Sequence, residues 1–292
     1  MKILWIIDVP DWAYDINAKS ISSKLNNHSH NFIYGNKTSN VDISQYDKVI
    51  IMFPPNISIC SHIDNYSKIV FTLNSHRVLG DINVDILKKI GSIVCANKSL
   101  YDYAIKYNKN SFFIPEGLDL NYFKCNNKQL DKFVIGFSGN IKASSSHKGY
   151  PIYKKVVDNL TSIDKSISSL CVGIGSTFVK RENIVNEFYN KISCLVLLSI
   201  NEGCSSVIME ALACGVPVIC TKVGYHGDVL ENNKNVIFIN RDEKELTNAI
   251  NLLYTNQYVY NEIKKNGIDF ASRYHNIDNI SKEFELAITN NH

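Results

Sequence analysis

The sequence predicts an α/β fold built from two domains, each with a doubly wound parallel sheet. Three observations lead to this prediction. Short runs of β-branched and other apolar residues recur along the 292-residue chain, helix-like amphipathic stretches separate them, and this alternation occurs in two successive blocks. Near-continuous apolar strands joined by helices are typical of parallel sheets with both faces buried.

The first block supplies six expected strands. We expect them at residues 2–7, 31–35, 48–53, 68–73, 92–96 and 111–114. Amphipathic periodicity predicts helices at residues 18–25 and 100–107. A block of five or six such strands is typical of a Rossmann-like domain.

The second block repeats this organisation. Its strands are expected at residues 133–138, 169–173, 194–199, 217–221 and 236–239, and its helices at residues 151–160, 185–191, 207–214, 244–254 and 259–270. The polar stretch 124–132 separates the blocks. We therefore expect domains at 1–127 and 128–275, and a C-terminal helix at 276–292 that packs back on the first domain.

The composition excludes several classes of protein. With 45% hydrophobic and 20% charged residues, the chain resembles ordinary globular proteins. Its net charge of +3 is too small for a strongly basic nucleic-acid-binding protein. Neither a signal-peptide pattern nor an apolar stretch near the ~20 residues needed to cross a bilayer is visible. We therefore expect a cytoplasmic protein with weak peripheral membrane contact at most.

The eight cysteines form no C-x-x-C pair and mostly lie in apolar runs. We expect reduced core thiols, not disulfides or zinc ligands. Glycine patterns also argue against a nicotinamide-binding domain, which would carry G-x-G-x-x-G after its first strand. After Asp8 the chain has no such glycines, and Gly173-Ile-Gly175 lacks the third glycine in register.

The most informative segment is residues 201–220. It follows an expected buried strand, turns at Gly203 and enters a helix for which Ser205 or Ser206 is a suitable N-cap. Gly215 is expected to end that helix. Because the first N–H groups of a helix lack partners within it, they bind anions, and a diphosphate would fit there.

Two carboxylates flank the start of this helix. Glu202 lies in the turn and Glu210 lies about one turn inside the helix. Carboxylates accept two hydroxyl hydrogen bonds at once, so one could hold a sugar and the other a ribose. The alternative interpretation makes Glu202 a solvated turn residue and Glu210 a surface charge near a helix N-terminus.

The segment from Glu202 to Val218 resembles the E-x7-E donor motif of retaining glycosyltransferases of family 4, whose form is E-G-x-G-x-x-x-x-E-A-x-A-x-G-x-P-V. Other pieces follow in the order of that family. They are residues 111–123 (I-P-N-G-V-D…F), residues 133–141 with Lys148-Gly149 (G-R-L…K-G), residues 170–175 (v-G-x-G) and residues 221–224. The resemblance covers most of residues 90–275.

The resemblance implies a GT-B fold, in which two Rossmann-like domains face a cleft, with the nucleotide-sugar donor in the second domain and the acceptor in the first. Lys148 would contact the donor pyrophosphate, Glu202 the hydroxyls of the transferred sugar, and Glu210 the ribose. The donor-binding residues expected on this basis are Gly139, Asn140, Lys148, Glu202, Gly203, Cys204, Ser205, Ser206, Val207 and Glu210. The expected donor is a UDP- or GDP-sugar, with no further cofactor.

The same resemblance implies metal-independent, front-face chemistry with retention of configuration. A fixed cation and helix N–H groups would stabilise the departing diphosphate. The sequence also lacks the Asp-x-Asp pair usual in metal-dependent GT-A enzymes, so we expect no metal site. Asn140 is a departure, because the family usually has Arg there, and an amide does not replace a guanidinium charge. Arg181 or Lys180, in the loop after Gly175, could supply that charge instead.

In the first domain, residues after the first strand are expected to meet the acceptor. Asp8, Trp12 and Tyr14 lie where the family usually has a glycine-rich acceptor loop. Trp12 and Tyr14 could stack on a sugar ring while Asp8 binds its hydroxyls. Trp12 could equally be a packing anchor.

Three polar residues follow the fourth expected strand. The resemblance makes His76 the first candidate for contact with the donor sugar, with Asn74 second. Arg77 could meet a phosphate or an anionic acceptor, or form an exposed salt bridge. We count His76 with Glu202 and Lys148 as expected catalytic residues.

These observations together predict a retaining glycosyltransferase that moves a sugar from a nucleotide-diphosphate sugar to a hydroxyl acceptor, expected to be a cell-surface or lipopolysaccharide-type glycan. The first alternative is a non-catalytic sugar-nucleotide-binding protein or partner subunit. Lesser alternatives are a nucleotide-sugar epimerase and an enzyme that glycosylates modified DNA bases. The sequence leaves the acceptor and the oligomeric state open.

Overall fold

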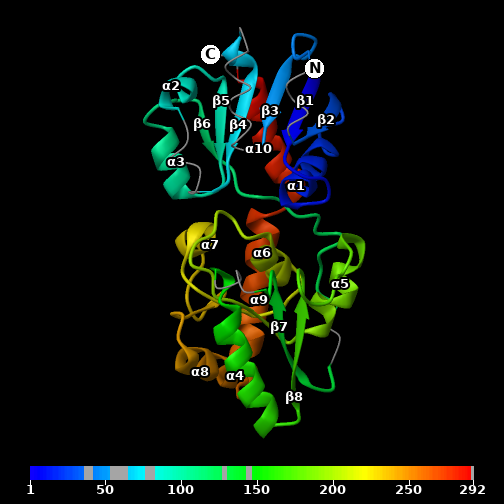
Figure 1. The fold of residues 1–292 in the computed structure, drawn as a ribbon, viewed down its shortest axis with the longest axis vertical. Coiled ribbons are helices and arrows are strands. Elements are labelled where there is room, and N and C mark those ends of the chain that lie inside the picture. Colours follow the sequence, from blue (N-terminus) through cyan, green and yellow to red (C-terminus); the bar gives the residue numbers. More distant parts are fainter. Residues whose placement is uncertain (36–41, 53–64, 76–82, 127–129, 143–146, 291–292) are drawn as a thin grey trace. The chain divides into compact units, whose positions relative to one another are not determined.

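The structure, a computed structural model, describes residues 1–35, 42–52, 65–75, 83–126, 130–142 and 147–290. The chain divides into two compact units (Figure 1). Unit 1 comprises Met1–Asp119 and His275–His292, and unit 2 comprises Leu120–Tyr274. Each unit is an α/β fold around one parallel sheet, as the strand and helix patterns predict.

The sheet of unit 1 has the strand order β2-β1-β3-β4-β5-β6, with parallel neighbours throughout. Its strands are β1 (Lys2–Ile7), β2 (Ser29–Tyr34), β3 (Lys48–Ile51), β4 (Ile69–Leu73), β5 (Ser92–Cys95) and β6 (Ser111–Phe113). Its helices are α1 (Ala13–Ser22), the 3₁₀ helix η3 (Tyr66–Lys68), α2 (Val84–Leu87), α3 (Lys98–Ala104) and α10 (Ile277–Thr289).

Both faces of this sheet are buried, which explains its continuous apolar strands. Leu4 and Ile6 of β1 point into a core shared with α2 and α3. Ile3, Trp5 and Ile7 of the same strand point into a second core shared with α1 and α10. Successive side chains of a strand alternate between the faces, so every residue of β1 after Lys2 is buried.

The C-terminal helix α10 belongs to unit 1. Ile280 and Phe284 are buried in its core, and the Phe284 ring stacks on Trp5 with centroids 5.8 Å apart. The Ser92 hydroxyl of β5 donates to the Ala287 carbonyl at 2.6 Å. The Asn276 side chain caps the helix by accepting from the Asp278 N–H at 2.9 Å.

The sheet of unit 2 has the order β11-β10-β9-β7-β8, also with parallel neighbours. Its strands are β7 (Phe133–Ser138), β8 (Ile167–Val172), β9 (Cys194–Leu197), β10 (Val218–Cys220) and β11 (Ile237–Phe238). Its helices are α4 (Tyr150–Ile163), η6 (Arg181–Asn183), α5 (Ile184–Glu187), η7 (Tyr189–Lys191), α6 (Ser206–Ala213), α7 (Gly224–Val229), α8 (Glu243–Thr255) and α9 (Gln257–Tyr274).

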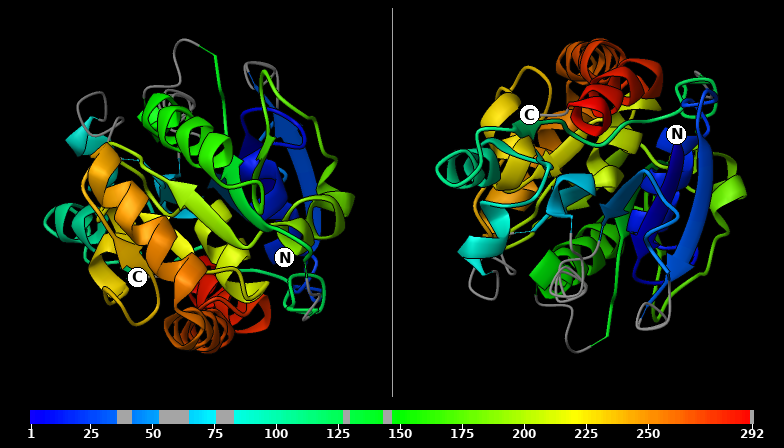
Figure 2. Two further views of the ribbon diagram at one scale, coloured as in Figure 1. Left: turned by 90° about the horizontal axis from the view of Figure 1, so that it is seen from below. Right: turned by 90° about the horizontal axis from the view of Figure 1, so that it is seen from above.

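Helices α4 and α8 lie side by side and cover one apolar face of this sheet (Figure 2). Tyr153 of α4 is buried against Phe137 of β7, and its hydroxyl donates to the Ile135 carbonyl at 2.8 Å. Helix α6 instead packs against β9, β10 and α9. This arrangement fixes the start of α6 next to the carboxyl end of β9.

The chain passes from unit 1 to unit 2 between Asp119 and Leu120, whereas the sequence predicts the boundary after residue 127. The reason lies in residues 120–126, which pack on unit 2. The Tyr122 hydroxyl donates to the Arg181 carbonyl at 2.8 Å, and the Phe123 ring meets Tyr189 edge-on. The return lies before His275, whose ring nitrogen is 2.8 Å from the Glu116 carbonyl.

Some helices differ from their predicted ranges. Helix α1 begins at Ala13, well before the predicted residue 18, and the segment 185–191 forms the short helices α5 and η7, separated at Phe188. Helices α2 and α7 are not predicted by periodicity, because each has at most six residues.

In the described part of the chain, no helix is long and apolar enough to span a membrane. The seven cysteines within it are free, and most are buried. Burial raises the pKa of Cys95 to about 12. Cys60 lies outside the described residues.

Candidate functional site

The carboxyl edge of the sheet in unit 2 brings Lys148 and Glu202 together. Glu202 lies in the turn after β9, where its Oε1 accepts from the Ser199 hydroxyl at 2.6 Å. The Lys148 Nζ lies 3.9 Å from the same oxygen. Both side chains are partly exposed, 29% for Lys148 and 17% for Glu202, so the pair can contact a ligand and each other.

Glycine is required where the Lys148 side chain passes the end of β7. Gly139 has φ +156°, and a Cβ added to it would lie 2.8 Å from the Lys148 Cδ. The Lys148 carbonyl accepts from the Leu198 N–H at 3.2 Å, which ties this segment to β9. The backbone therefore holds the ammonium group over the carboxyl ends of β7 and β9.

Asn140 does not supply the missing positive charge. Its side-chain Oδ1 accepts from the Lys142 N–H at 2.9 Å, so its amide stabilises its own loop. Of the expected donor-binding residues, all of which are described, Lys148 is the one with a positively charged side chain.

Helix α6 begins at Ser206, next to Glu202. Ser205 is the N-cap in an extended conformation, and its hydroxyl makes no cap hydrogen bond. The turn before it is supported by α7, because the Tyr225 N–H donates to the Gly203 carbonyl at 2.9 Å. Gly224 allows this close approach, since a Cβ there would lie 2.3 Å from the Glu202 carbonyl oxygen. The start of α6 thus adjoins the Lys148–Glu202 pair.

Glu210 has a different environment from that of Glu202. Its side chain is only 2% exposed. Its Oε1 lies 2.6 Å from Arg181 Nη1, and its Oε2 accepts from the Tyr189 hydroxyl at 2.7 Å. The interpretation of Glu210 as a surface charge is therefore wrong. Arg181, one of two residues that the sequence offers to replace the charge missing at Asn140, pairs with Glu210. Tyr189 joins the site without having been selected from the sequence.

The sequence offers Arg181 as a replacement for the phosphate-binding charge, but its pairing with Glu210 is not predicted from the sequence. The chain has only four arginines among its 31 basic residues, and Arg181 lies in the loop that follows β8 at the carboxyl edge. The sequence does not indicate a role for Tyr189 in the site, because a tyrosine next to Phe188 in an apolar stretch is typical of a core residue.

A cavity of about 610 Å³ opens beside the site at the carboxyl ends of β9, β10 and β11. Ser199, which donates to Glu202, lines it together with Thr221, Lys222 and Arg241. The Thr221 hydroxyl donates to the Ser199 carbonyl at 2.6 Å and fixes the neighbouring strand ends. The cavity offers room for a ligand that also reaches Glu202.

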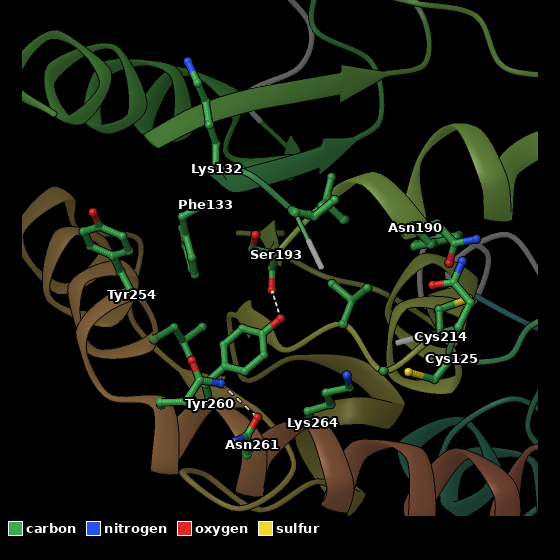
Figure 3. A pocket seen from close by; sticks show the side chains of 18 of the residues that line it. Cys125, Lys132, Phe133, Asn190, Ser193, Cys214, Tyr254, Tyr260, Asn261 and Lys264 are labelled. Atoms are coloured by element: carbon green, nitrogen blue, oxygen red, sulfur yellow. Dashed lines mark hydrogen bonds between the residues drawn. The ribbon is translucent and has the colours of Figure 1, made fainter. Parts of the chain in front are cut away.

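A second cavity, of about 560 Å³, lies at the opposite edge of this sheet, where β7 and β9 begin (Figure 3). Lys132 and Ser193 line it, and the Tyr260 hydroxyl donates to the Ser193 carbonyl at 3.0 Å. The residues that the sequence predicts for the donor site lie outside its lining.

In unit 1 the structure brings Asp8 and Tyr14 together after β1. Burial raises the pKa of Tyr14 to about 12, with further contributions from the charges of Glu116 and Asp8. One carboxylate oxygen of Asp8 is buried and has no hydrogen-bond partner among the residues that the structure describes. Trp12 is 58% exposed, so it does not anchor a core.

A buried carboxylate holds the loop that carries Trp12. Asp15 is fully buried and accepts from Lys19 Nζ at 2.7 Å, from the Asp11 N–H at 2.7 Å and from the Tyr34 hydroxyl at 2.9 Å. Asp11 adopts the left-handed φ of +62°, which its N–H bond to Asp15 stabilises.

Of the three residues expected after the fourth strand, only Asn74 is described, with its amide donating to the Thr72 hydroxyl at 3.1 Å. His76 and Arg77 lie outside the described residues. No group of three or more His, Cys, Asp or Glu side chains that could hold a metal ion occurs among the residues with described positions.

Comparisons with known proteins identify a family and relatives that this chain resembles. A family profile described as Glycosyl transferases group 1 matches residues 157–270, the segment that carries Arg181, Glu202 and Glu210. Protein CapJ of Staphylococcus aureus is 26% identical over 188 residues, covering 56% of this chain and 46% of that protein. The match thus spans about half the length of this curated relative.

Two solved structures resemble the whole chain. Alr3699/HepE of Anabaena, determined with UDP and glucose, has 16% identity and a TM-score of 0.75 over 99% of both chains. Sucrose-phosphate synthase of Thermosynechococcus elongatus has 15% identity and a TM-score of 0.79 over 98% of both chains. The chain therefore has the GT-B fold of these structures, with two Rossmann-like units, and its residues 157–270 resemble the group 1 glycosyl transferases.

Proposed function

We propose that the protein is a retaining glycosyltransferase of the family 4 type that uses a nucleotide-diphosphate sugar. The observation that carries this proposal is the Lys148–Glu202 pair beside the start of α6. A cation and helix N–H groups favour a diphosphate, and a partly exposed carboxylate binds sugar hydroxyls. The HepE complex with UDP favours a UDP-sugar over a GDP-sugar as the donor.

In this proposal the donor lies on unit 2 and the acceptor on unit 1. Lys148 stabilises the departing diphosphate, Glu202 positions the transferred sugar and Glu210 receives the ribose. The backbone around Gly139, Asn140 and residues 203–207 completes the donor site. No metal ion has a part in this mechanism, because the charge on the leaving group is met by Lys148 and the helix start.

The chemistry we propose is front-face displacement. The leaving phosphate oxygen takes the proton of the acceptor hydroxyl while Glu202 holds the sugar, so no protein base is assigned. His76 contacts the donor sugar in this proposal. Asp8, Trp12, Tyr14, Asn74 and Arg77 face the acceptor, which we propose is a growing surface glycan made at the cytoplasmic side.

The test is slow donor hydrolysis, which needs no knowledge of the acceptor. With UDP-glucose and EDTA, the protein should release UDP and, by NMR, the α-anomer of glucose first. Glu202→Gln and Lys148→Met should each lower the rate by roughly a hundredfold, because each removes a group that meets developing charge or holds the sugar.

Glu231→Gln and Lys234→Met are matched controls, because they remove the same charges from an exposed pair 2.6 Å apart. They should leave the rate unchanged. Release of the β-anomer first would contradict retention. An unchanged rate in Glu202→Gln would contradict the site.

A second candidate function is non-catalytic sugar-nucleotide binding. Asn140 favours it, because this residue engages its own loop at a position where a phosphate-binding arginine is expected. Calorimetric binding of UDP-glucose without any hydrolysis or transfer would select this function.

A further inference from the structure

The carboxylate of Glu210 is fully enclosed by the chain. Arg181 meets one oxygen at 2.6 Å and Tyr189 meets the other at 2.7 Å. With 2% of its side chain exposed, Glu210 can reach a ligand only if part of this enclosure gives way. Arg181, whose side chain is 36% exposed, forms the outer side of the enclosure.

Arg181 is itself held in place from the segment that enters unit 2. Its guanidinium carbon lies 4.7 Å from the centre of the Phe123 ring, over its face. The Tyr122 hydroxyl donates to the Arg181 carbonyl at 2.8 Å. Stacking and backbone support orient the guanidinium toward Glu210 and lower the entropy lost in making the pair.

The ionisation of Glu210 depends on its ion pair with Arg181. The groups that face Glu210 are Arg181 of η6, Tyr189 of η7, Lys148 before α4, Cys214 after α6 and Tyr122. Burial raises the pKa of Glu210, and Arg181, Tyr189 and Lys148 offset only part of that effect. Burial alone would lower the pKa of Arg181, but the charge of Glu210 outweighs it and raises that pKa.

We propose that Arg181 is a positioning residue for donor binding, which keeps Glu210 ionised and oriented to accept the ribose hydroxyls. This inference rests on the proposed function. An ionised carboxylate has about four acceptor positions, of which Arg181 and Tyr189 use two. The remaining two suit the two neighbouring hydroxyls of a ribose.

The test measures UDP-glucose affinity by calorimetry at about pH 6 and about pH 8, a range over which its diphosphate gains and loses no proton. Arg181→Met should weaken binding by roughly tenfold at the higher pH, because the carboxylate loses its charged partner. The loss should grow at the lower pH as Glu210 takes up a proton. Arg181→Lys should restore part of the affinity and reduce the pH dependence.

Lys180→Met is the matched control. Lys180 neighbours Arg181 in sequence but pairs at 3.9 Å with Glu182, so this variant removes one charge without uncovering Glu210. Its affinity should follow the wild type at both pH values. An equal, pH-independent loss in Arg181→Met would overturn the proposal, because a purely structural role predicts that result.

A second measurement does not depend on the donor. If Arg181 is removed, the pKa of Glu210 rises further, so the folded state keeps a proton that the unfolded chain releases. Thermal stability of Arg181→Met should then fall as pH rises from about 4.5 to the raised pKa. Arg181→Met/Glu210→Gln should lack this dependence.

The two measurements separate the two claims. If the wild type binds no sugar nucleotide, the proposed function fails, and the ribose-binding role of Glu210 and Arg181 fails with it. The thermal stability measurements still decide whether Arg181 keeps Glu210 ionised. If the wild type binds UDP-glucose and Arg181→Met binds it equally well at both pH values, the proposed function stands and the role of Arg181 is refuted.

Discussion

Gly139 shows how a single residue without a side chain positions a charged one. A methyl group there would lie 2.8 Å from the Lys148 Cδ, in a backbone conformation with φ +156°. Gly139→Ala should therefore displace Lys148 and weaken UDP-sugar binding by roughly tenfold, the cost of losing one charged contact. Calorimetry with UDP-glucose measures this.

Gly175→Ala is the comparison variant for that prediction. Gly175 has a positive φ of +86°, but the atom nearest to its added methyl is the Ile141 Cγ1 at 3.0 Å. It should reduce stability without reaching Lys148. Similar losses of affinity in both variants would show that general strain, and not the position of Lys148, is responsible.

The negative charge of Asp15 stabilises the loop after β1. Burial tends to raise its pKa, but the Lys19 ammonium, the Asp11 N–H and the Tyr34 hydroxyl outweigh it and lower the pKa. Asp15→Asn should lower the free energy of unfolding by about 2 kcal/mol near neutral pH.

The pH dependence of this loss has a defined sign. A carboxylate with a lowered folded pKa stabilises the protein above its unfolded pKa of about 4, and the stabilisation disappears as pH falls through the folded value. Urea unfolding at several pH values should show the wild type approaching Asp15→Asn in acid. A difference that stays constant down to the lowest pH would show that shape, not charge, is what matters at Asp15.

At the scale of elements, α10 completes unit 1 from the far end of the sequence. Phe284 is buried and stacks on Trp5. Phe284→Ala should cost about 3–5 kcal/mol, measured by urea unfolding, because it leaves a cavity in this core. Leu286→Ala on the same helix, at a side chain that is 63% exposed, should change stability little. Equal effects would contradict the packing of α10 described here.

The elements also show why the sequence predicts some features and not others. Strands of both sheets fall close to their predicted ranges, since burial on two faces leaves a continuous apolar pattern. Helix α1 begins earlier than predicted because Asp15 is buried in its first turn, and a periodicity argument places an aspartate outside. The partners that make this burial possible, Lys19 and Tyr34, come together only in the fold.

At the scale of the whole molecule, the two-domain α/β organisation could be predicted, but the path between the units could not. The polar stretch 124–132 marks a break in composition, while residues 120–126 already contact unit 2 through Tyr122 and Phe123. Likewise, the sequence motif predicts that Glu202 and Glu210 both bind hydroxyl groups. In the structure Glu202 is partly exposed and Glu210 is buried, so the two carboxylates differ in what they can contact. The Arg181 partner comes from a loop whose position depends on the folded unit.

The most direct test of the account is a thermal shift of the full chain with UDP-, GDP-, ADP- and CMP-sugars in the presence of EDTA. A ligand at about 100 times its Kd adds about 2.7 kcal/mol, which corresponds to several degrees for units of this size. The account predicts a shift with UDP-sugars that Lys148→Met abolishes and Lys234→Met retains. No shift with any sugar nucleotide, or an equal shift in Lys148→Met, would contradict it.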